Sequence, residues 1–137
     1  MTVGWFMKAL LQYSDFHSRA RRREFWWFVL LEYFIFWFML SMFGAMAVQA
    51  GAFDDGTFDS SKVSTVAWIF YWGGLVVALA LVVPYFAVTV RRLHDTGRSG
   101  WWSVFLLFLP IVVWILALFD GDPQPNQYGE DPKHLER

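Results

Sequence analysis

Three long apolar stretches constrain this chain more than any other feature of its sequence. They cover residues 25–49, 66–90 and 101–119, and Glu32 is the only charged residue in them. A hydrocarbon core about 30 Å thick needs roughly 20 apolar residues in a helix, so each stretch is long enough to cross it. The runs are continuous and do not alternate with polar residues, which argues against membrane strands. We therefore predict an all-α membrane protein with three transmembrane helices.

The composition favours lipid contact over a water-soluble core. Hydrophobic residues make up 57% and aromatic residues 21% of the 137 residues. A soluble domain of this size buries too little surface to hide so many rings, whereas rings that face lipid need no burial. The first stretch begins too late and runs too long for a secretory signal peptide. The sequence contains no cysteine, which excludes disulfides and thiolate metal sites.

Two polar segments flank the apolar stretches in what we expect to be a single membrane domain over residues 1–137. Segment 1–24 contains apolar residues at helical spacing, which predicts an interfacial amphipathic helix on the membrane surface. These residues are Trp5, Phe6, Ala9, Leu10 and Tyr13. Residues 120–137 form a polar tail with Pro, Asn and Gly, which predicts an irregular segment.

Basic residues beside the apolar stretches predict the orientation. The N-terminal segment and the loop before the third stretch carry Lys8, Arg19, Arg21, Arg22, Arg23, Arg91, Arg92 and Arg98. The loop between the first two stretches holds Lys62 against three aspartates. Because Lys and Arg accumulate in cytoplasmic loops, we expect the N-terminus and the loop before the third stretch in the cytoplasm. Three crossings then place the tail outside.

A second topology stays open beside this one. The third stretch could fold back at Pro110 as a re-entrant hairpin, which would leave the tail in the cytoplasm. The ordered tail motif from Asn126 to Pro132 favours this alternative, because nothing explains such a motif outside the membrane.

The loop before the third stretch carries local turn signals. Gly97 suits a position with positive φ, and Ser99 suits the N-cap of the following helix. If the second helix continues past residue 90, Arg91 and Asp95 lie one turn apart and would pair.

The two basic clusters are the candidate binding site. Arginine forks suit phosphate oxygens, and each basic residue near anionic lipid contributes about 1 kcal/mol. The plainer interpretation is that these charges only set the topology and that the glycines act as hinges. The candidate lipid-binding or anion-binding residues are Arg19, Arg21, Arg22, Arg91, Arg92, His94, Asp95 and Arg98.

Three ionisable residues suggest other chemistry. Glu32 inside the first span could handle protons or ions, or it could be a carboxylate that is paired with an arginine or left neutral. His94 and Asp95 could act as acid and base on a lipid headgroup, with Ser99 nearby in sequence. No second histidine lies at metal-ligand spacing from His94, and no set of acidic or thiol ligands accompanies it, so we expect no metal site and no cofactor.

Three motifs carry a family resemblance over nearly the whole chain. They are residues 16–26 around Arg19-Ala20-Arg21-Arg22, residues 91–102 from Arg91-Arg92-Leu93-His94-Asp95 to Trp101-Trp102, and residues 126–132 from Asn126 to Pro132. Together they resemble the domain-of-unknown-function 805 family, DUF805, a group of small bacterial inner-membrane proteins. The resemblance implies an inner-membrane location and a compact helical fold, and it supplies no catalytic residues. Val113 replaces a glycine that is frequent in the family, which favours a stiffer third helix.

Three functions follow as hypotheses. The preferred one is a non-enzymatic module that binds anionic phospholipid headgroups or a membrane partner through its cytoplasmic basic clusters. The second is an oligomeric transporter or channel component that uses Glu32. The third is a lipid-headgroup enzyme that uses His94 and Asp95. The expected partners are the lipid bilayer and either a second copy or another membrane protein, and no nucleic acid.

Overall fold

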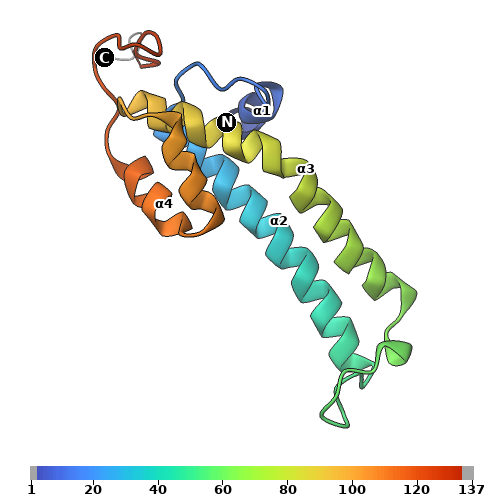
Figure 1. Cartoon of the computed structure of the whole chain (residues 1–137). Coiled ribbons are helices and arrows are strands. Elements are labelled where there is room, and N and C mark those ends of the chain that lie inside the picture. Colours follow the sequence, from blue (N-terminus) through green and yellow to red (C-terminus); the bar gives the residue numbers. More distant parts are fainter. Residues whose placement is uncertain (1–2, 134–137) are drawn as a thin grey trace. The chain divides into compact units, whose positions relative to one another are not determined.

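The computed structural model describes residues 3–133, and every regular element in that range is a helix (Figure 1). The elements are α1 (Val3–Leu11), α2 (Arg22–Gln49), η1 (Ser60–Lys62), α3 (Thr65–Asp95), η2 (Gly100–Leu107) and α4 (Pro110–Leu118), where η denotes a 3₁₀-helix. The predicted all-α class is therefore confirmed. Helix α1 matches the amphipathic segment expected near the N-terminus, although it ends at Leu11.

Helices α2 and α3 are the two helices of the described chain that could cross a membrane. They contain 28 and 31 residues, which at 1.5 Å per residue gives about 42 and 46 Å, more than the roughly 30 Å hydrocarbon core. Only 11% of the most apolar window of each helix is buried within the protein. A core helix of a soluble protein would be mostly buried, so these surfaces need lipid.

The predicted third helix over residues 101–119 is not continuous, so three transmembrane helices are not confirmed. The stretch forms η2 with 8 residues and α4 with 9 residues. At about 2.0 and 1.5 Å per residue they reach roughly 16 and 14 Å, and neither crosses the hydrocarbon core. The break occurs at Leu109, which adopts φ −148° and ψ 69° because the residue before a proline disfavours helical geometry. Pro110 then starts α4, where its missing N–H costs nothing.

The turn between η2 and α4 pairs its own backbone donors. The N–H groups of Phe108 and Leu109 both donate to the Phe105 carbonyl, at 3.2 and 2.7 Å, and Val112 N–H donates to the Leu109 carbonyl at 3.1 Å. Pro110 has no N–H to satisfy. This local pairing is what a turn away from water requires.

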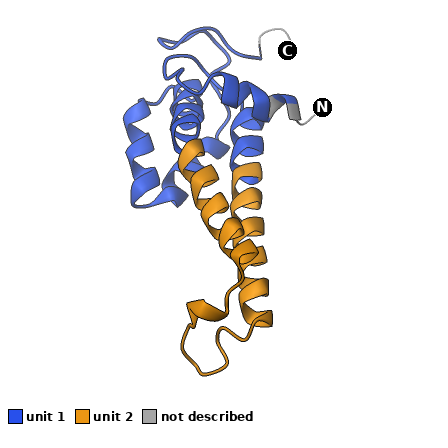
Figure 2. Cartoon of the chain, turned by 90° about the vertical axis from the view of Figure 1, so that its right-hand side faces the viewer, with its two compact units in different colours: residues 1–30, 82–137 blue, residues 31–81 orange. Residues whose placement is uncertain are grey.

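The chain divides into two compact units (Figure 2). Unit 1 comprises residues 1–30 and 82–137, and unit 2 comprises residues 31–81. Both α2 and α3 contribute to each unit. In unit 2, a small core forms where the helices meet their connecting loop, with Ala47, Ala52, Val63 and Ala67 buried and Phe43, Met46 and Trp68 packed against them.

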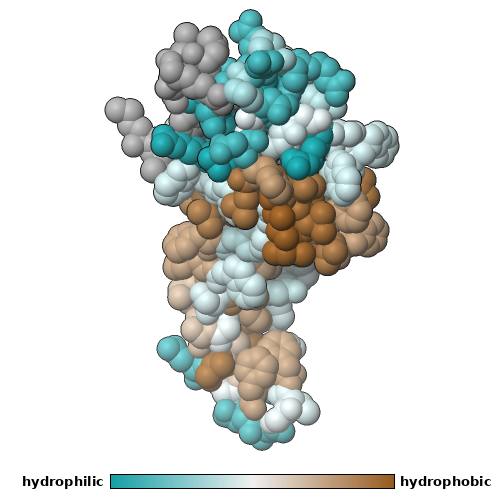
Figure 3. Space-filling view, turned by 90° about the vertical axis from the view of Figure 1, so that its left-hand side faces the viewer, coloured by the Kyte–Doolittle hydropathy of each residue, from teal (hydrophilic) through white to brown (hydrophobic). Residues whose placement is uncertain are grey.

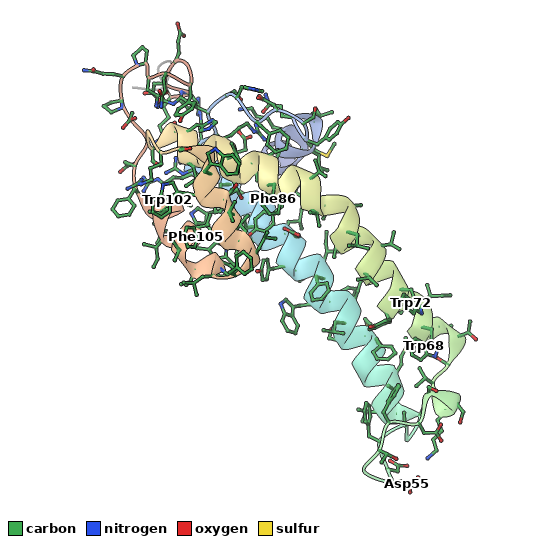
Figure 4. The ribbon with its side chains drawn as sticks, in the orientation of Figure 1. Asp55, Trp68, Trp72, Phe86, Trp102 and Phe105 are labelled. Atoms are coloured by element: carbon green, nitrogen blue, oxygen red, sulfur yellow. The ribbon has the colours of Figure 1, made fainter. Side chains whose placement is uncertain are left out.

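Aromatic contacts hold the helices of unit 1 together. The Phe28 ring of α2 lies between Phe6 of α1, with centroids 5.3 Å apart, and Tyr85 of α3, with centroids 6.3 Å apart. Trp114 of α4 donates its indole N–H to the Tyr85 hydroxyl at 3.1 Å. Side chains of η2 and of the last part of α3 are visible in Figure 4, where Trp102, Phe105 and Phe86 are labelled.

Candidate functional site: a buried arginine network beside a cationic pocket

Unit 1 contains a buried cluster that we call the arginine network, composed of Arg19, Arg91, Arg92, Glu24 and Asp95. All five side chains are buried, and Arg91 and Arg92 are 0% exposed. Burying a charge costs free energy unless a partner compensates for the lost water. The contacts of the network therefore decide what these residues can do.

Glu24 and Arg91 form the first pair of the network. Arg91 Nη1 lies 2.7 Å from Glu24 Oε1 and also donates to the Gln12 side chain. Lys8 of α1 approaches the other carboxylate oxygen of Glu24 at 2.9 Å. One glutamate thus ties α1, the start of α2 and the end of α3 together.

Asp95 is the centre of the second group. Its Oδ1 accepts from Arg19 Nε at 3.0 Å, and its Oδ2 is paired with Arg92 Nη1. The expected partner, Arg91, is instead bound to Glu24, so the predicted Arg91–Asp95 pair does not form. Arg92, three residues before Asp95 on α3, forms the ion pair with Asp95 instead. Arg19 binds the other oxygen of the same carboxylate.

Carbonyl oxygens of the C-terminal part of the chain take most of the remaining guanidinium donors. Arg19 Nη1 donates to the carbonyls of Gln124 at 2.9 Å and Gly129 at 3.2 Å. Arg92 donates to the carbonyls of Ala117, at 3.1 Å, and Phe119. The tail thus lies against the N-terminal basic segment within unit 1. The expectation that the membrane separates these two segments conflicts with these contacts.

The ends of the elements explain how the residues converge. Gly97 has φ +69°, its N–H donates to the His94 carbonyl and the Arg98 N–H donates to the Leu93 carbonyl, a Schellman motif that ends α3. Ser99 accepts from the Trp101 N–H and caps η2. Both turn predictions are confirmed.

A close backbone approach brings the start of the tail to Asp95. A Cβ added at Gly121 would lie 2.0 Å from Asp95 Oδ2, so only glycine fits beside this carboxylate. The Asp122 N–H donates to the Asp95 carbonyl at 2.7 Å. The tail is therefore seated on the C-terminal end of α3.

Residues of the tail motif, Asn126 to Pro132, complete this docking. The rings of His94 and Tyr128 stack with centroids 3.6 Å apart and an interplanar angle of 2°. The Asn126 side-chain amide donates to the His94 carbonyl at 3.0 Å and to Asp122 at 3.1 Å. Asn126 and Gly129 also exchange two backbone hydrogen bonds of 3.0 Å. The tail motif that the sequence left unexplained thus packs over the C-terminal end of α3.

Asp15 shapes the turn that leads from α1 to Arg19. Its Oδ1 accepts from the backbone N–H groups of His17 at 3.0 Å and Ser18 at 3.1 Å, and its Oδ2 accepts from the Ser18 hydroxyl. Partial burial raises the pKa of Asp15, but the hydrogen bonds from Ser18 and His17 outweigh it, and the net pKa lies below its ordinary value of 3.8. The turn is therefore built on an ionised carboxylate.

A cavity of about 250 Å³ lies beside the network, and we call it the cationic pocket. The described residues that line it are Arg21, Arg22, Arg23 and Lys133. Asp120, at the rim, pairs with Arg22 at 2.6 Å and with Lys133 at 3.5 Å, and its side chain is 70% exposed. Arg21 donates to the Pro132 carbonyl. The pocket therefore brings four cationic side chains together, and the exposed carboxylate of Asp120 pairs with two of them.

A second cavity of about 300 Å³ shares two arginines with this pocket, and we call it the tryptophan groove. It is lined by Arg22, Arg23, Trp26, Trp27, Leu30 and Leu118. Four of the six residues are apolar, and they come from the first turns of α2 and from the end of α4. Figure 3 shows hydrophobic and hydrophilic surface adjoining on one face of the molecule.

The structure divides the eight candidate anion-binding residues into three groups and places Glu32 apart from them. Arg19, Arg91, Arg92, His94 and Asp95 are brought together and are buried. Arg19 and Arg92 bind Asp95 and C-terminal carbonyls, Arg91 binds Glu24, and the His94 ring stacks on Tyr128. Arg21 and Arg22 line the cationic pocket. Arg98 lies over the Phe119 ring, 4.9 Å from its centroid. Glu32 lies in unit 2, where its Oε2 is buried and has no hydrogen-bond partner among the residues that the structure describes.

Three residues of the pocket were not on the candidate list. Arg23 belongs to the same basic run as Arg21 and Arg22, so its signal was present in the sequence. Lys133 and Asp120 were missed because the tail was expected on the opposite side of the membrane. No group of three or more His, Cys, Asp or Glu side chains that could hold a metal ion occurs among residues 3–133.

Comparisons with known proteins match this chain to a family over most of its length. The family described as "Protein of unknown function (DUF805)" matches residues 13–130. Inner membrane protein YhaH of Escherichia coli K12 is 34% identical over 135 residues, which cover 96% of this chain and 98% of YhaH. Inner membrane protein YhaI of the same strain is 29% identical over 136 residues, which cover 96% of this chain and 97% of YhaI. No solved structure matches.

A shorter similarity involves 38 residues, 55% identical to the uncharacterized protein YiiR of Escherichia coli K12, and covers 28% of this chain and 23% of YiiR. The two relatives matched over their full length are named inner membrane proteins, which agrees with the two long apolar helices of this chain. The motifs that suggested the family at the outset lie within the matched range or at its edge. This chain is a membrane protein that belongs to the DUF805 family.

Proposed function

We propose that this protein is a non-enzymatic inner-membrane module that binds phosphate-bearing anions at the cationic pocket, on the cytoplasmic side. The observation that carries the proposal is a cavity whose described lining consists of four cations, Arg21, Arg22, Arg23 and Lys133. Its volume of about 250 Å³ is below the roughly 300–1,000 Å³ of sites for drug-sized ligands, so it suits a headgroup or a small phosphate ester.

Charge distribution supports the cytoplasmic side for the pocket. The basic residues beside the spans gather in the N-terminal segment and in the loop after α3, whereas the loop between α2 and α3 carries Asp54, Asp55 and Asp59 against Lys62. Lys and Arg accumulate on the cytoplasmic side of membrane proteins. The tail contacts of Arg19 then bring Lys133 to the same side.

A re-entrant hairpin formed by η2 and α4 is the second part of the proposal. Both helices are too short to cross, and the apolar residues around their turn are exposed, with Phe108 80% and Leu107 65% accessible. A hairpin that dips into the hydrocarbon and returns would cover these side chains with lipid. It would also return the tail to the side from which η2 starts.

The arginine network itself has few hydrogen-bond donors left for an anion. Asp95, Glu24 and the tail carbonyls already take the donors of Arg19 and Arg92 and one face of Arg91. Asp95 is also out of reach of a headgroup, because it is buried and both of its carboxylate oxygens are paired with arginines. The geometry therefore favours binding at the pocket over headgroup chemistry at His94 and Asp95.

The test measures anion binding by purified protein in a neutral detergent. Two probes are used, glycerol 3-phosphate, followed by phosphorus NMR, and phosphatidylglycerol, followed by native mass spectrometry. Arg22→Gln, Arg23→Gln and Lys133→Gln should each weaken binding by about fivefold, since one basic residue contributes about 1 kcal/mol. Asp120→Asn should strengthen binding, because it releases Arg22 and Lys133.

Lys62→Gln is the matched control, since Lys62 is an exposed cation of unit 2 that pairs with Asp55. It should bind both probes like the unmodified protein. The proposal fails if the pocket variants bind both probes as well as the Lys62→Gln protein does.

A further inference from the structure

We infer that the occupant of this site is a phospholipid whose phosphate lies in the cationic pocket and one of whose acyl chains lies in the tryptophan groove. The inference rests on the proposed function and goes beyond it, because it assigns the ligand to the membrane and not to free phosphate esters. The observation behind it is that Arg22 and Arg23 line both cavities.

The chain spacing places charged and apolar lining residues of the two cavities on shared faces of α2. Arg22 and Trp26, like Arg23 and Trp27, are four residues apart on α2 and therefore share a helix face. Leu30 follows one turn later on that face. Over the eight residues from Arg22 to Leu30 the helix rises about 12 Å, so the surface changes from charged to wholly apolar within two turns.

The opposite wall of the groove comes from α4. Leu118 is its last residue and is exposed, and its carbonyl accepts from Arg22 Nη1 at 3.1 Å. This hydrogen bond holds the wall against the same arginine that reaches the pocket. A substitution of the Leu118 side chain leaves the backbone carbonyl in place, so it changes the groove without removing the contact.

The chemistry of the groove favours an acyl chain as its occupant. Its apolar side chains offer no hydrogen-bond acceptor, and both ring systems present broad faces to a flexible chain. In a bilayer, acyl chains are as apolar as leucine, so transfer from lipid gains little hydrophobic energy. Selectivity therefore comes from the phosphate in the pocket, and the groove orients the lipid that the pocket selects.

Tryptophan also supplies a direct readout. Trp27 is 41% exposed and lies at the boundary between the arginines and the apolar part of the groove. An acyl chain that carries bromine atoms quenches the fluorescence of an indole it touches. Phosphatidylglycerol with brominated chains should therefore quench Trp27 more than phosphatidylcholine with the same chains.

The experiment combines a groove variant with the two probes used for the pocket. Leu118→Trp fills the groove, and it should reduce phosphatidylglycerol bound in native mass spectrometry by roughly fivefold while leaving glycerol 3-phosphate binding unchanged. Leu79→Trp is the control, since Leu79 is a similarly exposed leucine of α3 in unit 2. It should bind both probes normally.

A second measurement keeps the inference testable if Leu118→Trp does not fold. The extra quenching by brominated phosphatidylglycerol over brominated phosphatidylcholine should shrink in Trp27→Phe, which leaves Trp26 in the groove, and disappear in Arg22→Gln. Lys62→Gln should retain it.

The outcomes separate the two proposals. The acyl-chain inference is overturned, and the pocket stands, if pocket variants weaken binding but Leu118→Trp does not and the two brominated lipids quench equally. It is also overturned if glycerol 3-phosphate displaces phosphatidylglycerol at equal concentration. If the pocket variants bind both probes normally, the proposed function fails and this inference fails with it.

Discussion

Burial of the charged side chains of Arg19, Arg91 and Arg92 costs free energy, because these arginines have almost no access to water. Removing an ion from water costs several kcal/mol, and close partners with additional hydrogen bonds must offset that cost. Arg19 and Arg92 meet the requirement with Asp95 and with backbone carbonyls of the tail. Lysine could not replace either, because an ammonium lacks the planar fork that reaches several acceptors at once.

Asp95→Asn tests this reading of the network. The substitution leaves Arg19 and Arg92 buried without their carboxylate, and loss of one partner of a buried pair costs about 3–5 kcal/mol. Thermal unfolding in neutral detergent should show a large loss of stability. Asp55→Asn removes an exposed pair with Lys62 and should cost under about 1 kcal/mol. Equal losses for the two variants would mean that the network does not stabilise the fold.

Asp15→Asn should reveal the hydrogen-bonded carboxylate before Arg19 through its pH dependence. The pKa of Asp15 is lowered in the folded protein, so its ionised form stabilises the fold above pH 3.8 and that contribution is lost as the pH falls through the lower, folded pKa. Solvent screens this partly exposed carboxylate, so the effect should stay under about 1 kcal/mol. The stability difference between Asp15→Asn and the unmodified protein should be constant near neutrality and shrink below pH 3.8. A difference that widens with acid would contradict the account.

Single residues also show what the sequence could and could not predict about the site. Gly97 and Ser99 were predictable because their roles depend on neighbours within a few residues. The partners of Arg19 were not, since Asp95 and Gly129 lie 76 and 110 residues away. The sequence therefore identifies the basic residues collectively as a candidate site. Which of them are buried and which line a pocket depends on the tertiary fold.

At the scale of elements, the same distinction between local and tertiary signals explains why the sequence predicts α2 and α3 but not the break in the third apolar stretch. Length and hydropathy identify α2 and α3, because nothing interrupts them except Pro84, which α3 includes. The elements of the third stretch are more apolar than α2 and α3, but its length of 19 residues leaves no margin for a break at Leu109. Composition alone cannot distinguish a short transmembrane helix from a hairpin, because both are uniformly apolar. The difference lies in the backbone geometry of the residue before Pro110.

The tail provides the prediction that belongs to this scale. Tyr128→Ala removes the ring that stacks on His94, so residues 120–133 should detach and be cleaved faster by limited proteolysis. Tyr128→Phe keeps the stacked ring and should be cleaved at the rate of the unmodified protein. The docking account is contradicted if the alanine and phenylalanine variants are cleaved alike.

For the whole molecule, the contacts of the tail matter most. They bring Lys133 to Arg21, Arg22 and Arg23, so a site that the sequence would have split across a membrane lies within one compact unit. Two spans with a re-entrant hairpin leave both ends of the chain on one side, and three spans do not. Every functional proposal made above depends on this topology.

Cysteine labelling in intact cells tests that topology most directly, and the sequence has no cysteine to interfere. Single cysteines replace Ser60, in the loop between α2 and α3, and Gln127, in the tail, and a membrane-impermeant thiol reagent is added outside. The account predicts labelling at position 60 and none at position 127 until the cells are opened. Labelling at both positions in intact cells would place the tail outside, separate Lys133 from the arginines and contradict the account.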